Sequence, residues 1–124
     1  MPVSQPFTLS ARVRSLVCAG RGIGVMLRTQ QNAWIHAAAT IVVLAAGFVL
    51  RVSAVDWCLL ALATMSVWTA EALNTAFEFL TDIASPSFHP LAEKAKDVAA
   101  GAVLITACGA AVVGLIVFVP HLSG

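Results

Sequence analysis

The sequence is poor in charged residues. Only 10% of its 124 residues are Asp, Glu, Lys or Arg, whereas about a quarter are charged in an ordinary globular domain. The net charge of +1 gives no reason to expect nucleic acid as a partner. The three cysteines and three histidines are scattered, which indicates neither a disulfide framework nor a zinc site. The chain also lacks internal repeats and low-complexity tracts.

Hydrophobic residues make up 60% of the chain, and they are gathered in three long runs, 33–50, 57–80 and 98–119. The first run is apolar apart from His36 and Thr40. The second has about 24 residues, or roughly 36 Å as a helix, which exceeds a bilayer core of about 30 Å. The sequence therefore predicts an all-α integral membrane protein, one domain over residues 1–124 with three transmembrane helices.

The segment 8–30 precedes these runs and mixes arginines with apolar residues. A basic amphipathic pattern of this kind is typical of a helix that lies in the membrane interface. Its four arginines and the two lysines after the second run give six cations on one side of the membrane, against Arg51 on the other. This asymmetry predicts a cytoplasmic N-terminus and a cytoplasmic loop over residues 82–97.

Two glutamates, Glu71 and Glu78, interrupt the second run. A charged side chain at mid-bilayer depth costs about 2.5 to 3.5 kcal/mol on insertion scales, so intramembrane acids are candidate functional residues. Together with Asn74 and Asp82 they are spaced i, i+3, i+7 and i+11, which places all four within a helical sector of roughly 80°. The spacing predicts one polar stripe that runs toward the cytoplasm.

The sequence Lys94-Ala95-Lys96-Asp97 is expected to open the third transmembrane helix. A helix start with lysines attracts anions such as phosphates, and carboxylates suit Mg²⁺. The polar stripe and these two lysines together could support phosphoryl transfer from ATP to a lipid hydroxyl at the cytoplasmic interface. The glycines of residues 20–24 do not form a P-loop, because no strand precedes them and no Gly-Lys-Ser/Thr follows.

Two motifs carry a family resemblance. The first is Glu71-x-x-Asn74-Thr75-Ala76-x-Glu78-x-x-x-Asp82. The second, over residues 85–104, reads Ser-Pro-x-x-His-Pro-Leu-Ala-x-x-Ala-Lys-Asp-x-Ala-Ala-Gly-Ala-Val-Leu. The pair resembles the small prokaryotic diacylglycerol kinase family, which includes undecaprenol kinases. The resemblance implies a homotrimer of three-helix subunits with interfacial N-terminal helices and active sites shared between neighbours, in the bacterial cytoplasmic (inner) membrane, with ATP as co-substrate and Mg²⁺ as cofactor.

The resemblance also implies roles for the acidic residues. Glu71 matches the general base that activates the lipid hydroxyl, and Glu78 matches a ligand of the nucleotide-bound metal. Gln30 stands where many members have a second metal-ligating glutamate, and a glutamine offers a neutral oxygen without a charge. We therefore expect lower metal affinity or a different metal count. Trp34 likewise replaces a common arginine.

Nucleotide binding is implied for a further set of residues. Lys96 matches the lysine on the ATP phosphates, Asp97 lies beside it, and His89 matches a loop histidine that approaches the nucleotide. Arg14 is a candidate for a phosphate contact because arginine often serves that purpose. The residues expected to shape the site are Asn74, Asp82 and Asn32.

The sequence thus predicts an ATP-dependent lipid kinase that acts on diacylglycerol or undecaprenol. Two alternatives remain open. A small oligomeric transporter or channel could use the two glutamates as a cation relay, although this leaves the lysines unexplained. A catalytically silent scaffold would bind ATP without turnover, and the missing acid at Gln30 is compatible with it. A third interpretation, in which both glutamates are structural and pair with Asn74 or with a lysine across a helix interface, is disfavoured by the two motifs.

Overall fold

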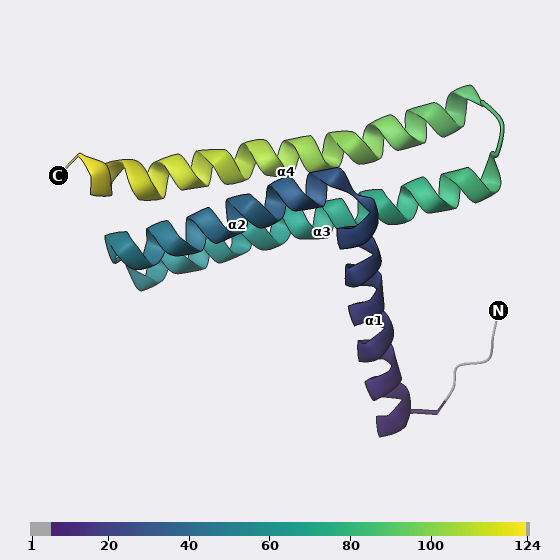
Figure 1. Ribbon diagram of the computed structural model, residues 1–124, viewed down its shortest axis with the longest axis horizontal. Coiled ribbons are helices and arrows are strands. Elements are labelled where there is room, and N and C mark those ends of the chain that lie inside the picture. Colours follow the sequence, from purple (N-terminus) through teal and green to yellow (C-terminus); the bar gives the residue numbers. More distant parts are fainter. Residues whose placement is uncertain (1–5, 124) are drawn as a thin grey trace.

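The computed structural model describes residues 6–123, which fold into four helices (Figure 1). These are α1 (Leu9–Thr29), α2 (Gln31–Leu50), α3 (Ala54–Ala84) and α4 (Pro90–Leu122). Helices α2, α3 and α4 run side by side in an elongated bundle, and α1 projects away from it (Figure 1). The prediction of an all-α chain is confirmed. Residues 1–5 and 124 of the predicted domain lie outside the described residues.

Helix α1 starts at a side-chain cap, because the Thr8 hydroxyl accepts a hydrogen bond from the Ala11 backbone N–H at 3.2 Å. It ends where Gln30 adopts an extended conformation, with φ −110° and ψ 117°. Most of its apolar side chains are exposed, and Met26 near its end is buried. The position of α1 in the membrane interface stays a prediction, and these exposed apolar side chains are what an interfacial helix requires.

Three local features define the short turn between α2 and α3. Arg51 adopts the left-handed conformation, with φ 54°, and ends α2. Ser53 and Asp56 then form a reciprocal capping box that starts α3. Gly47 allows the two helices to approach, since a Cβ there would lie 2.4 Å from the Trp57 ring.

Helices α3 and α4 form a long hairpin through residues 85–89 (Figure 1). The prediction that the third membrane helix opens at Lys94 was wrong, because α4 begins one turn earlier. His89 caps it by accepting the Leu91 N–H at 3.1 Å, and Pro90 occupies its first position, which needs no N–H donor. The connecting loop is therefore shorter than the expected 82–97.

Two of the described helices, α2 and α4, are long and apolar enough to cross a membrane by length and composition. Helix α3 has 31 residues and carries the polar stripe, and its crossing remains a prediction. The helices extend beyond the apolar runs because caps such as the Ser53 box and the His89 cap set their ends. Helix α4 also continues through Pro120 to Leu122.

Candidate active site

The polar stripe predicted on α3 extends from the bundle interior to the interhelical loop. Glu71 is 0% exposed, and Asn74 and Thr75 beside it are also buried. Glu78 is half-buried, and Asp82 is exposed. The stripe on this 31-residue helix thus has one carboxylate in the bundle core, one at its margin and one near the C-terminal end of the helix.

Each carboxylate of the stripe has one side-chain partner, and each partner comes from a different element. His36 of α2 places Nε2 3.3 Å from Glu71 Oε2. Gln30, between α1 and α2, donates its Nε2–H to Glu78 Oε2 at 3.2 Å. Lys96 of α4 donates to Asp82 Oδ1 at 2.5 Å. The stripe therefore connects α3 to α2, to α4 and to the junction between α1 and α2.

The two most buried side chains of the stripe each have a polar atom without a hydrogen-bond partner within residues 6–123. Glu71 Oε1 and Asn74 Oδ1 are buried and have no hydrogen-bond partner within residues 6–123. A buried polar atom without a partner costs about 1–3 kcal/mol, and more for a charged group. Thr75 does not relieve this cost, because its hydroxyl donates to the Glu71 backbone carbonyl. Both atoms can therefore accept a hydrogen bond from a group that is not part of residues 6–123.

A second group of site residues gathers where α3 and α4 meet their connecting loop. Asp82, His89, Lys96 and Asp97 line a pocket of about 330 Å³. The hydrogen bond from Lys96 to Asp82 raises the pKa of Lys96. Desolvation opposes this rise, and the charges of Asp82 and Glu78 add to it. Lys96 therefore stays cationic at physiological pH, and its side chain is 42% exposed.

His89 has a defined orientation in this pocket. Its Nδ1 accepts the Leu91 N–H, so the proton of the neutral ring lies on Nε2. Within residues 6–123, Nε2–H has no hydrogen-bond acceptor, and it is a donor suited to a phosphate or a nucleotide oxygen.

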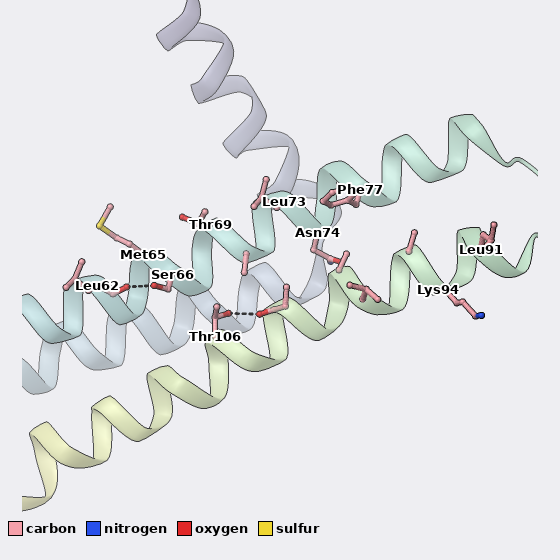
Figure 2. A pocket seen from close by; sticks show the side chains of 15 residues that line it. Leu62, Met65, Ser66, Thr69, Leu73, Asn74, Phe77, Leu91, Lys94 and Thr106 are labelled. Atoms are coloured by element: carbon pink, nitrogen blue, oxygen red, sulfur yellow. Dashed lines mark hydrogen bonds between the residues drawn. The ribbon is translucent and has the colours of Figure 1, made fainter.

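An apolar groove of about 880 Å³ runs between α3 and α4 (Figure 2). Most of its walls are aliphatic side chains and alanines, with Phe77 and Met65 on α3. Asn74 extends from α3 toward α4, and Lys94 lies near one end of the groove (Figure 2). The groove thus extends from Leu91 and Lys94 near the loop, past Asn74 of the polar stripe, to Leu62 and Thr106 in the apolar part of the hairpin.

The structure brings together most of the predicted site residues. Glu71, Asn74, Glu78 and Asp82 share one face, and Lys96 joins it from α4. Lys96 and Asp97 lie almost two turns inside α4, so their side chains, and not the N–H groups of a helix start, line the pocket. Arg14 on α1 and Asn32 on α2 are both exposed, and no hydrogen bond or ion pair joins them to the others within residues 6–123.

Sequence reasoning missed the partners of Glu71. His36, Thr40 and Trp68 form a polar group beside it, in which Trp68 Nε1–H donates to Thr40 Oγ1 at 3.0 Å. The available signals were a histidine in an apolar run and a tryptophan three residues before the glutamate. Neither signal shows which side chain of another helix is adjacent.

The described residues contain no group of three or more His, Cys, Asp or Glu side chains that could hold a metal. Mg²⁺ sites in phosphoryl-transfer proteins commonly use one or two carboxylates together with phosphate oxygens and waters. Glu78 is suited to this, because it is half-buried, accepts one hydrogen bond and lies between Glu71 and Asp82 on the stripe.

Comparison with known proteins gives consistent matches. The family model described as prokaryotic diacylglycerol kinase matches residues 17–118. An undecaprenol kinase of Bacillus subtilis is 42% identical over 109 residues, which are 88% of this chain and 89% of that protein. A diacylglycerol kinase of Synechocystis sp. is 39% identical over 105 residues, or 84% of this chain and 60% of that protein. The family match covers every candidate site residue except Arg14.

Proposed function

Because the chain belongs to the prokaryotic diacylglycerol kinase family and is a membrane lipid kinase, we propose that it transfers the γ-phosphate of ATP directly to a lipid hydroxyl. We propose undecaprenol as its preferred acceptor, with diacylglycerol as the alternative. The relative named for undecaprenol matches this chain at higher identity and over nearly its whole length. The proposed site is the polar stripe of α3 with the pocket around Lys96.

The arrangement of Glu71 is the observation that carries this proposal. One carboxylate oxygen is held by His36, and the other is buried without a partner. Such an oxygen suits a general base, since it accepts the hydroxyl proton as the lipid oxygen bonds to the γ-phosphorus and the bond to ADP breaks. Because Glu71 is 0% exposed, neighbouring side chains must move before a hydroxyl reaches it.

The pocket around Lys96 is proposed to hold the nucleotide phosphates. Lys96 is cationic and accessible, and His89 presents a free Nε2–H. Asp97 lines the same pocket, and Glu78 lies one turn along the stripe from Asp82. Arg14 would join the site only from the α1 helix of a neighbouring subunit.

Mg²⁺ is proposed to be held by Glu78, with Gln30 as its neutral neighbour. When bound with ATP, the ion neutralises charge on the phosphate oxygens. Gln30 contributes a hydrogen bond to Glu78 rather than a second negative charge. This makes Glu78 the main protein ligand within one chain.

We further propose a homotrimer with active sites shared between subunits, in the bacterial inner membrane with a cytoplasmic N-terminus. The groove between α3 and α4 would accept a helix of a second copy, because the small residues Ala102 and Thr106 line it and Ala110 and Gly114 continue their spacing. A neighbouring chain there could also supply the donor that Asn74 Oδ1 lacks.

The proposal is tested by offering undecaprenol and diacylglycerol separately in mixed micelles, with radiolabelled ATP, Mg²⁺ and the purified protein. We expect label chiefly in undecaprenol, and loss of at least about 100-fold in turnover for Glu71→Gln, as for removal of a general base. Label chiefly in diacylglycerol would reverse the acceptor assignment. Label in neither lipid, with the assembly intact, would favour a transporter or scaffold.

A further inference from the structure

The proposed base has a neighbour that the proposed reaction does not explain. His36 Nε2 lies 3.3 Å from Glu71 Oε2, and its side chain is 14% exposed. The histidine comes from α2, 35 residues earlier in the sequence. Within residues 6–123, it is the one side chain that forms a hydrogen bond with the Glu71 carboxylate.

The position of His36 is itself fixed by α3. The Trp68 ring meets the imidazole edge-on, with centroids 6.1 Å apart and an interplanar angle of 71°. Trp68 also donates its Nε1–H to Thr40, and the Thr40 hydroxyl donates to the His36 backbone carbonyl at 2.7 Å. Because Trp68 and Glu71 lie three residues apart on one helix, they hold the imidazole between them.

We infer that His36 is a positioning residue for Glu71: a neutral imidazole donates Nε2–H to Oε2 and fixes the carboxylate so that Oε1 faces the acceptor hydroxyl. This inference rests on the proposed role of Glu71 as the base. An ionised carboxylate only accepts hydrogen bonds, so the shared proton belongs to the imidazole. Without the anchor, the carboxylate can rotate and the two oxygens become equivalent.

A packing role alone would give a different pattern. If His36 only filled space, any side chain of similar volume would serve, and the loss of the N–H would leave the reaction unchanged. If it positions the base, the N–H donor matters and the effect falls on turnover rather than on substrate binding.

The test compares His36→Leu, which fills the space without a donor, with His36→Gln, whose amide N–H can replace Nε2–H. We expect His36→Leu to lower kcat about 10- to 100-fold, as misplaced catalytic groups do, with KM for ATP and lipid within about twofold. His36→Gln should recover most of the lost kcat. His121→Leu is the matched control, because His121 contacts the Val117 carbonyl near the far end of α4, and its kcat should equal that of the unchanged protein.

Equal losses in His36→Leu and His36→Gln would overturn the inference, as would an unchanged kcat in His36→Leu. Glu71→Gln, measured in the same assay, separates this failure from that of the proposed function. A nearly inactive Glu71→Gln with a fully active His36→Leu would refute the inference alone. An active Glu71→Gln would refute the proposed base.

A second measurement covers the case in which the His36 variants fail to assemble. Side-chain ¹⁵N spectra of the histidines, recorded in the otherwise unchanged protein and in Glu71→Gln, report the tautomer and the hydrogen bond. We expect the proton of His36 on Nε2, and a shift of this signal in Glu71→Gln while the His121 signals stay in place. A proton on Nδ1, or a His36 signal that does not respond to Glu71→Gln, would contradict the inference.

Discussion

Gln30 stands where the family resemblance leads us to expect a second metal-ligating glutamate. Its amide donates to Glu78 at 3.2 Å, so the two side chains are complementary without a metal. A glutamate at the same place would bring two negative charges together, which favours a cation between them. The residue at position 30 thus decides whether Glu78 has a hydrogen-bond donor or a second carboxylate as its neighbour.

We therefore predict that Gln30→Glu tightens apparent Mg²⁺ affinity by about tenfold, equivalent to about 1.4 kcal/mol of binding free energy. The measurement is a Mg²⁺ titration of lipid phosphorylation at saturating ATP. Gln31→Glu is the control, because it adds the same charge at an adjacent exposed position. Identical Mg²⁺ dependence of the two variants would show that residue 30 does not face the metal.

At the scale of the elements, the α2–α3 turn depends on one close approach. Gly47 leaves room for the Trp57 ring, which also packs against Phe48 with centroids 5.0 Å apart. This contact lies beside the small core of Val52, Leu60 and Val117. It therefore holds α2 against α3 at the end of the bundle opposite the Lys96 pocket.

Gly47→Ala is expected to destabilise the protein by about 1–3 kcal/mol, as overpacking of a tight contact does. Gly109→Ala is the matched control, because a Cβ there meets nothing within 4 Å, and it should be neutral or slightly stabilising. Unfolding in a denaturing detergent, followed by the helical circular dichroism signal, measures both. A Gly47→Ala protein as stable as the control would mean that Trp57 moves aside without cost.

The whole molecule has more apolar surface than its own bundle covers, since most of its large hydrophobic side chains are exposed. Lipid can cover such a surface, but it cannot provide hydrogen bonds to Glu71 Oε1 and Asn74 Oδ1. A substrate or a neighbouring subunit can both cover apolar surface and provide hydrogen bonds to these two atoms. The single chain is therefore a part of the active assembly that we propose.

Shared active sites predict complementation between inactive subunits. The Glu71→Gln and Lys96→Ala proteins should each be inactive. In a symmetric ring in which each site takes Glu71 from one subunit and Lys96 from the next, co-assembly of the two variants in equal amounts should restore about a quarter of the normal turnover. Turnover after unfolding and joint reassembly measures the effect. A mixture as inactive as its components would show that Glu71 and Lys96 act from the same chain.

Local sequence determined much of this protein. The all-α fold class follows from the long apolar runs, and the polar stripe from Glu71 to Asp82 follows from the helical period. Both features depend only on residues within one segment. The paired motifs were enough to predict the family and the lipid kinase activity. The start of α4 was predicted one turn late, although His89 and Pro90 are a recognisable cap and first residue.

Tertiary structure alone decided which residues meet across helices. The contacts of Glu71 with His36, of Glu78 with Gln30 and of Asp82 with Lys96 span 35, 48 and 14 residues. Each contact depends on the rotation of two helices about their axes and on their displacement along those axes. Packing contacts such as that of Gly47 against Trp57 set both. The pattern of residues within one segment does not determine how two helices are rotated or shifted relative to each other. The sequence therefore identified the acidic residues, and the fold determined their partners.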